Sequence, residues 1–373
     1  MSFRYVSGIN KPGFNPLAAQ TTTTLYNLFT WGLNGDGQLG LGNTTNYSSP
    51  KQVGSLTNWL NLAGGAYFSL AVKTDGTLWS WGRNSFGELG LGSTVTQSSP
   101  NQVGSLTAWY QVAGGDNHSI ATKTDGTIWT WGNNAEGQLG LGNRTYYSSP
   151  KQVGALTTWL NIAGGRYQTV AVKTDGTLWT WGANGAGALG LGNTTNYSSP
   201  KQVGALTNWL NVASGYRFVL STKTDGTLWS WGRNHAGQLG LGDTTNRSSP
   251  VQIGALTAWL TVSCGQSHAI ATKTDGTIWV WGFNAYGQLG LNNTTNYSSP
   301  KQVGSLTTWS KTTGGQGSTL AIKTDGTLWA WGRNGQAQLG LGNITYYSSP
   351  KQVGSLTTWN AVKSGGYFTL ALG

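Results

Sequence analysis

Cysteine, histidine and acidic residues are scarce in this chain, which has 373 residues but one cysteine, three histidines and 11 Asp and Glu together. A single cysteine, Cys264, cannot form an internal disulfide, so the sequence gives no sign that the fold depends on an oxidising compartment. No Ser/His/Asp or Cys/His arrangement and no metal-ligand spacing can be traced through so few reactive side chains. We therefore expect a protein that is not an enzyme, with no cofactor and no metal.

Long apolar runs are also missing. The first 20 residues contain no unbroken apolar core of the roughly 7–15 residues found in a secretion signal. Nothing later approaches the roughly 18 apolar residues that a spanning helix needs. We expect neither a signal peptide nor a membrane span.

Charge is sparse and dispersed. Charged residues make up 9% of the chain, and the formal net charge is +11. Several lysines each stand two residues before an aspartate, and we expect these opposite charges to cancel: Lys73, Lys123, Lys173, Lys223, Lys273 and Lys323. The remaining basic residues follow no single run, which argues against nucleic acid as the partner.

Glycine and tryptophan are abundant, with 58 and 20 copies. The dipeptide Trp-Gly recurs from Trp31 to Trp331 at a constant spacing of 50 residues, and a second tryptophan series from Trp59 to Trp359 keeps the same spacing. Such regular self-similarity is typical of repeat architectures and outweighs chain length as a guide to domain number. The sequence predicts seven β-rich units.

One unit shows how the strands are arranged. Residues 59–65, 68–73 and 77–82 are apolar runs, and the segment SSPKQV after a Gly-rich loop is a fourth, outer strand where proline is tolerated. The Asp-Gly pair in KTDGT predicts a hairpin with a type I′ turn. GQLGLG lacks the Lys-Ser/Thr of a nucleotide site and recurs in nearly every unit, so we interpret it as turn chemistry.

The two ends of the chain predict how the ring closes. The C-terminal run KSGGYFTLALG supplies the first two strands of a unit, and residues 25–32 and 48–53 supply the last two. A shared last blade would remove free sheet edges. We therefore expect an all-β, seven-bladed propeller of four-stranded blades over residues 25–373, preceded by an arm, residues 1–24, that docks to a larger assembly. We expect the Trp79 and Trp81 series to fill the core between blades.

The run DGTLWSWGRNSFGELGLG, with AGGDNHSIATKTDG in the next unit, resembles the repeats of the regulator of chromosome condensation family. The resemblance covers residues 25–373 and implies a seven-bladed propeller. Members of this family include an exchange factor for a small GTPase, chromatin binders, ubiquitin-ligase modules and bacterial protein inhibitors, so the fold does not select a function. The constant 50-residue period leaves no room for an inserted wedge, which argues against an exchange-factor role.

Variation between units is confined to one face. The turn KTDGT and the link VGSLT or VGALT are nearly constant, whereas the loops at residues 66–68 and 83–86 and their equivalents change in every unit. Variable loops on a constant scaffold indicate a recognition surface, although exposed loops also vary when nothing constrains them. The candidate partner-binding residues are Tyr67, Phe68, Arg83, Phe86, Asp116, Asn117, His118, Arg166, Tyr167, Gln168, Tyr216, Arg217, Phe218, Arg233, His235, His268, Phe283, Tyr286 and Arg333.

These features favour a non-enzymatic module that binds a protein or a surface glycan. A virion or appendage surface protein is one candidate, because near-identical Asn/Thr/Tyr/Gly-rich units are similar to phage structural proteins. An intracellular protein-binding regulator or inhibitor is the alternative. The location is accordingly the virion or cell exterior for a phage protein, and the cytoplasm otherwise.

Overall fold

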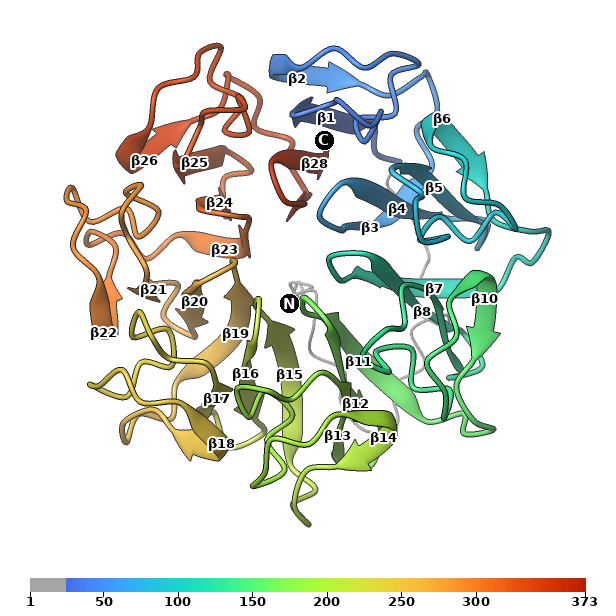
Figure 1. The fold of residues 1–373 in the computed structure, drawn as a ribbon. Coiled ribbons are helices and arrows are strands. Elements are labelled where there is room, and N and C mark those ends of the chain that lie inside the picture. Colours follow the sequence, from blue (N-terminus) through green and yellow to red (C-terminus); the bar gives the residue numbers. More distant parts are fainter. Residues whose placement is uncertain (1–24) are drawn as a thin grey trace, which may run out of the picture.

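The computed structural model describes residues 25–373, which form a closed ring of seven four-stranded antiparallel sheets (Figure 1). Neighbouring sheets follow one another around the ring in chain order, as the colours of Figure 1 show. The predicted seven-bladed propeller is confirmed. The predicted arm, residues 1–24, lies outside the described residues.

Within each blade the four strands lie side by side, from an innermost strand at the centre of the ring to an outermost strand at its rim. The innermost strands are β3 (Trp59–Gly64), β7 (Trp109–Gly114), β11 (Trp159–Gly164), β15 (Trp209–Ser214), β19 (Trp259–Cys264), β23 (Trp309–Gly314) and β27 (Ala361–Ser364). The second strands are β4 (Phe68–Lys73), β8 (His118–Lys123), β12 (Gln168–Lys173), β16 (Phe218–Lys223), β20 (His268–Lys273), β24 (Ser318–Lys323) and β28 (Phe368–Leu372).

The outer half of each blade is a second hairpin. The third strands are β5 (Leu78–Gly82), β9 (Ile128–Gly132), β13 (Leu178–Gly182), β17 (Leu228–Gly232), β21 (Ile278–Gly282), β25 (Leu328–Gly332) and β1 (Leu28–Gly32). The outermost strands, which carry the tolerated proline, are β6 (Gln97–Gln102), β10 (Tyr147–Gln152), β14 (Tyr197–Gln202), β18 (Arg247–Gln252), β22 (Tyr297–Gln302), β26 (Tyr347–Gln352) and β2 (Tyr47–Gln52).

The two ends of the chain build one blade together, as predicted. Strand β28 pairs with β27 on one side and with β1 on the other, in the order β2-β1-β28-β27. Leu28 lies opposite Leu372, and Gly32 lies opposite Phe368. The main chains of Asn27 and Gly373 also exchange two hydrogen bonds. The ring is thus closed by hydrogen bonds between its first and last strands.

The hydrophobic core lies between blades. Trp81 is fully buried, and its indole N–H donates to the carbonyl oxygen of Gln38 in the preceding blade at 2.9 Å. Every residue of the Trp-Gly series makes the equivalent bond, including Trp31 to Gln338 across the closing blade. Trp59 meets Trp81 edge to face, with ring centroids 6.1 Å apart. The tryptophans of the Trp-Gly series therefore join neighbouring blades by both packing and hydrogen bonds.

The Trp79 series lies at the edge of this core and is only partly buried. The ammonium of Lys73 stands 3.7 Å from the Trp79 ring, and the indole N–H donates to Thr77 Oγ1. Asp75 accepts from the main-chain N–H and the hydroxyl of Thr77, so it forms no ion pair with Lys73. The lysine thus lies over the tryptophan face, while its charge still acts on that of the neighbouring aspartate, as the expected cancelling of charges requires.

The constant turn also differs from its predicted type. Gly76 has φ +77, whereas Asp75 is not left-handed, so the turn is not type I′. The N–H of Gly76 bonds Lys73 O, and Lys73 N bonds Thr77 O, which is a three-residue hairpin with glycine in the left-handed position. A Cβ at residue 76 would lie 1.9 Å from Thr107 O. The turn is constant because its backbone packs against the link to the next blade.

Candidate partner-binding face

The loops after the first and third strands of each blade lie together on one face of the ring, which we call the variable face. In each blade a main-chain bond joins them, for example from Arg83 N to Tyr67 O and from Arg233 N to Arg217 O. Most predicted partner-binding residues are partly or fully exposed on this face: Tyr67, Arg83, Phe86, Asp116, Asn117, Arg166, Tyr167, Tyr216, Arg217, Arg233, His235, Phe283, Tyr286 and Arg333.

The remaining predicted residues do not reach a partner. The first residue of each second strand points between blades, and the side chains of Phe68, His118, Gln168, Phe218 and His268 are all 0% exposed. The Phe68 ring fills the space above Gly65, where a Cβ would lie 2.0 Å from its Cε1. These five assignments were wrong, because the position is a core position whose occupant changes from blade to blade.

Burial controls the chemistry of the two histidines at this core position. Desolvation lowers the pKa of His118 to about 3 and that of His268 to about 4. Both imidazoles are therefore neutral near pH 7. They serve as packing and hydrogen-bonding groups rather than as surface acids or bases.

One exposed cluster joins three consecutive blades. The Arg166 guanidinium lies 3.5 Å from a carboxylate oxygen of Asp116, 4.7 Å from the Tyr167 ring and 4.1 Å from the Tyr216 ring. Arginine stacked between two tyrosines keeps a planar set of N–H donors in place. We call these four residues the Arg166 cluster.

Asp116 is the only acid in this cluster. Desolvation by the surrounding loops raises the pKa of Asp116 to about 7, against the opposing effect of Arg166. The carboxyl nevertheless keeps 26% of its side chain exposed. A partly exposed carboxyl that gains or loses its charge near neutral pH makes the Arg166 cluster sensitive to pH.

A second exposed cluster lies where the ring returns to the closing blade. Arg333 stands 5.0 Å from the rings of both Tyr286 and Tyr367, and Phe283 and Tyr346 each meet Tyr286 edge to face at 5.8 Å. We call these five residues the Arg333 cluster. Predicted residues Arg333, Tyr286 and Phe283 are thus brought together, whereas Tyr346 and Tyr367 were missed.

A sequence signal for the missed tyrosine exists. In these units, the fourth residue after the third strand contacts a residue of the next blade that lies 60 positions later in the sequence. The rings of Phe86 and Tyr146 are 5.8 Å apart, and Glu136 accepts a hydrogen bond from Asn196 at 2.6 Å. Aromatic residues therefore face aromatic residues, and polar residues face polar ones. Tyr146 and Tyr346 replace the Asn or Thr of other units at this position, which is the departure that identifies them.

Metal and membrane features can be checked only within residues 25–373. No group of three or more His, Cys, Asp or Glu in this range could hold a metal ion. No helix in it has the length and apolar character needed to cross a bilayer.

The fold is shared with several solved propellers. The structure of human WBSCR16 has a TM-score of 0.83 at 22% identity, covering 93% of this chain and 98% of that one. Prp20p from Saccharomyces cerevisiae, described with its binding to Gsp1p and histones, has a TM-score of 0.83 at 20% identity, covering 94% and 92%. Yeast RCC1 (Prp20) bound to Kap60 has a TM-score of 0.86 at 19% identity, covering 100% and 94%. At these identities the likeness shows the fold.

Sequence comparison is more specific. No curated protein matches the chain. The model of the RCC1-like domain matches residues 158–373, and that of the regulator of chromosome condensation (RCC1) repeat matches residues 27–72, 75–122 and 125–172. Because the first of these models alone spans more than half of the chain, the protein belongs to the regulator of chromosome condensation (RCC1) repeat family.

Proposed function

We propose that this protein is a non-enzymatic binding module that recognises a protein or glycan partner through the variable face. The observation that carries the proposal is the Arg166 cluster, in which an arginine and two tyrosines from neighbouring blades are held together and partly exposed. Tyrosine and arginine are the residue types that dominate the energy of protein interfaces.

The charge of the variable face indicates the chemistry of the partner. Five arginines lie on it, namely Arg83, Arg166, Arg217, Arg233 and Arg333. Only Arg166 among them is paired with a carboxylate of the described chain. Guanidinium groups bind carboxylates in a bidentate manner. A partner that presents carboxylates, such as an acidic protein surface or an acidic sugar, fits this face better than a neutral one.

Known members of the fold support a protein partner. Prp20p was described with binding to Gsp1p and histones, and yeast RCC1 (Prp20) was solved bound to Kap60. We extend protein binding to this chain, but not those particular partners. A virion or appendage surface role, with residues 1–24 docking to a larger assembly, is part of the same proposal, and an intracellular regulator or inhibitor is its alternative.

The experiment compares one variant on each face of the ring. The first carries Arg166→Ser, Tyr167→Ser and Tyr216→Ser on the variable face. The second carries Leu106→Ser, Leu156→Ser and Leu206→Ser in the constant links on the opposite face, where these leucines are about half exposed. Both remove three large surface side chains from neighbouring blades, and neither touches the core between blades.

Binding is measured by capture from cell extract and on a glycan array that includes acidic sugars. We expect the variable-face variant to lose the partner that the wild type captures, and the link variant to keep it. Equal binding by all three proteins would remove the basis of the proposal. Retention by the face variant with loss by the link variant would assign recognition to the opposite face.

A further inference from the structure

A cavity of about 260 Å³ lies on the axis of the ring and is lined by residues of all seven innermost strands and the loops that follow them. We call it the channel. Its wall repeats one position per blade: Ala63, Ala113, Ala163, Ala213, Ser263, Thr313 and Lys363. Six of these side chains are small, and the seventh is a lysine.

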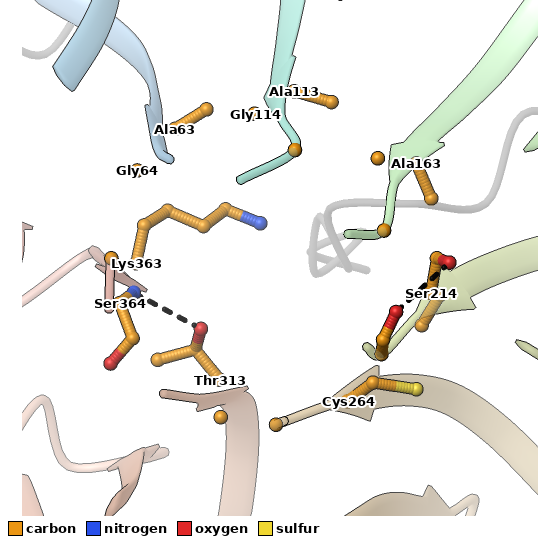
Figure 2. A pocket seen from close by; sticks show the side chains of 18 of the residues that line it. Ala63, Gly64, Ala113, Gly114, Ala163, Ser214, Cys264, Thr313, Lys363 and Ser364 are labelled. Atoms are coloured by element: carbon orange, nitrogen blue, oxygen red, sulfur yellow. Dashed lines mark hydrogen bonds between the residues drawn. The ribbon is translucent and has the colours of Figure 1, made fainter. Parts of the chain in front are cut away.

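Lys363 reaches from β27 into the channel, where Figure 2 shows its side chain extended into the space between the strands. Its side chain is exposed to that space, but it makes no hydrogen bond or ion pair with any residue of the described chain. An ammonium group has three N–H donors and ordinarily uses them. Those of Lys363 have no partner among the described residues and are open to a ligand in the channel.

The charge around Lys363 is positive. Lys311, in the neighbouring blade, donates to the main-chain and side-chain oxygens of Asn360. Burial, and after it the charge of Lys363, lowers the pKa of Lys311. The one acid that lines the channel is Asp116, and it lies against Arg166. No carboxylate of the channel wall is therefore left to neutralise the two lysines.

The wall beside Lys363 offers a second donor. The hydroxyl oxygen of Thr313 accepts a hydrogen bond from Ser364 N at 3.2 Å, the dashed line at left in Figure 2. Its hydroxyl proton has no acceptor among the described residues, so it is free to donate. Across the channel from Lys363 the wall carries the small residues Ala113, Gly114 and Ala163, and the hydroxyl of Ser214 lies further round it.

Desolvation by the channel walls lowers the pKa of Lys363. A bound anion would reverse this effect, because an opposite charge nearby stabilises the ammonium form. The channel also has room for a tetrahedral anion together with several waters, each of which occupies about 30 Å³.

We propose that the channel binds a small oxyanion of the phosphate or sulfate type, held by the ammonium of Lys363 and the hydroxyl of Thr313. Their three N–H groups and one O–H group match the acceptor oxygens of such an ion. Lys363 and Thr313 belong to the innermost strands rather than to the variable loops, although Asp116, Arg166 and Tyr216 of the Arg166 cluster also line the channel.

The test titrates inorganic phosphate, and separately sulfate, into the full-length protein by calorimetry, with chloride at matched ionic strength as the reference. Three proteins are compared: the wild type, Lys363→Ala and Lys351→Ala. Lys351 lies on the outermost strand β26, with its ammonium 5.6 Å from the Tyr347 ring. Lys351→Ala therefore removes one positive charge, as Lys363→Ala does, but far from the channel. Alanine at residue 363 copies four other blades, so the variant should fold, which its melting curve checks.

We expect saturable one-to-one binding by the wild type and by Lys351→Ala, and at least about tenfold weaker binding by Lys363→Ala, equivalent to about 1.4 kcal/mol. Phosphate should also raise the melting temperature of the wild type more than that of Lys363→Ala. Equal affinity in Lys363→Ala and the wild type would overturn the proposal. So would the absence of saturable binding to the wild type by either anion.

Discussion

His118 donates a hydrogen bond from Nε2 to Thr169 Oγ1 over 3.1 Å, from one blade to the next. The direction follows from the threonine, whose own hydroxyl proton is given to Gln138 O at 2.8 Å. His268 and Thr319 repeat the arrangement, with Thr319 donating to Gln288 O. In both histidines Nδ1 is buried without a partner, so protonation would create an unpaired buried charge.

The buried histidines should make the ring sensitive to acid. The folded pKa of His268 is about 4, against 6.5 for the free side chain, so the unfolded chain binds a proton in this range and the folded chain does not. The free energy of unfolding should therefore fall by about 2 kcal/mol for this residue between about pH 7 and about pH 5.

The variant His268→Phe with Thr319→Ser copies the pair Phe68 and Ser119 of another blade and should lose this part of the pH dependence. Denaturant unfolding at several pH values measures it. The exposed His235→Asn is the control and should keep most of the dependence. If the free energy of unfolding fell as steeply toward acid pH in the His268 variant as in the wild type, buried His268 would not be the cause of the acid sensitivity.

Glu88 should make the ring less stable as the pH rises, whereas the buried histidines make it less stable as the pH falls. Five blades have glutamine at this buried position, whereas the Glu88 carboxyl is desolvated, which raises its pKa to about 7, and one of its oxygens has no partner. The folded state then holds a proton that the unfolded chain loses near pH 4.5, so stability falls as pH rises from about 4.5 to above 7.

Replacing Glu88 by glutamine should remove that loss and raise the free energy of unfolding at about pH 8 by roughly 3 kcal/mol, since each pKa unit is worth about 1.4 kcal/mol. Thermal melts from acid to alkaline pH measure the effect. The matched variant Glu136→Gln removes the same charge from the surface and should leave the slope due to Glu88 in place. A melting temperature of Glu88→Gln below that of the wild type at alkaline pH would refute the prediction.

Alanine substitutions at two glycines should distinguish the free-energy cost of backbone strain from the cost of disturbed packing. Gly40 has φ +72 and its Cβ would lie 2.7 Å from Trp81 Nε1, whereas Gly54 has φ +58 with nothing within 4 Å. Alanine at residue 54 should cost about 1–2 kcal/mol from the left-handed conformation alone. Alanine at residue 40 should cost at least about 2 kcal/mol more, because it also displaces the indole and its bond to Gln38 O. If denaturant unfolding gave equal losses of stability for the two variants, the loop around Gly40 would accommodate the added methyl group without moving Trp81.

The contact between Phe86 and Tyr146 should be energetically coupled. Phe86→Ala with Tyr146→Asn copies the combination Ala186 and Asn246 found elsewhere in the ring. A double-mutant cycle should give a coupling energy of about 0.5–1.5 kcal/mol, as edge-to-face aromatic pairs do. A second cycle with Phe86→Ala and Tyr346→Asn, which do not touch, should be additive. Coupling of equal size in both cycles would mean that these loops respond to mutation as a whole.

The strands, the ring and its closure were predictable because each depends on local patterns repeated at constant spacing. The turn chemistry was harder: the Asp75-Gly76 pair is typical of a type I′ turn, and the backbone angles and main-chain hydrogen bonds show a three-residue hairpin instead. Phe68 and its equivalents were misplaced because a residue that changes between units resembles an exposed one. Their burial arises from the next blade, about 50 residues away, and the constant Gly65 three positions earlier was the available sign.

The closing blade has a consequence for biosynthesis. Of the described strands, β1 and β2 are made first, and β28, which pairs with β1, is made last. Until β28 has been made, β1 has no strand beside it on that edge, and an open edge accepts a strand from any chain that offers one. Neighbouring nascent copies can therefore exchange their last strands, so correct assembly depends on each chain completing its own circle before it meets another.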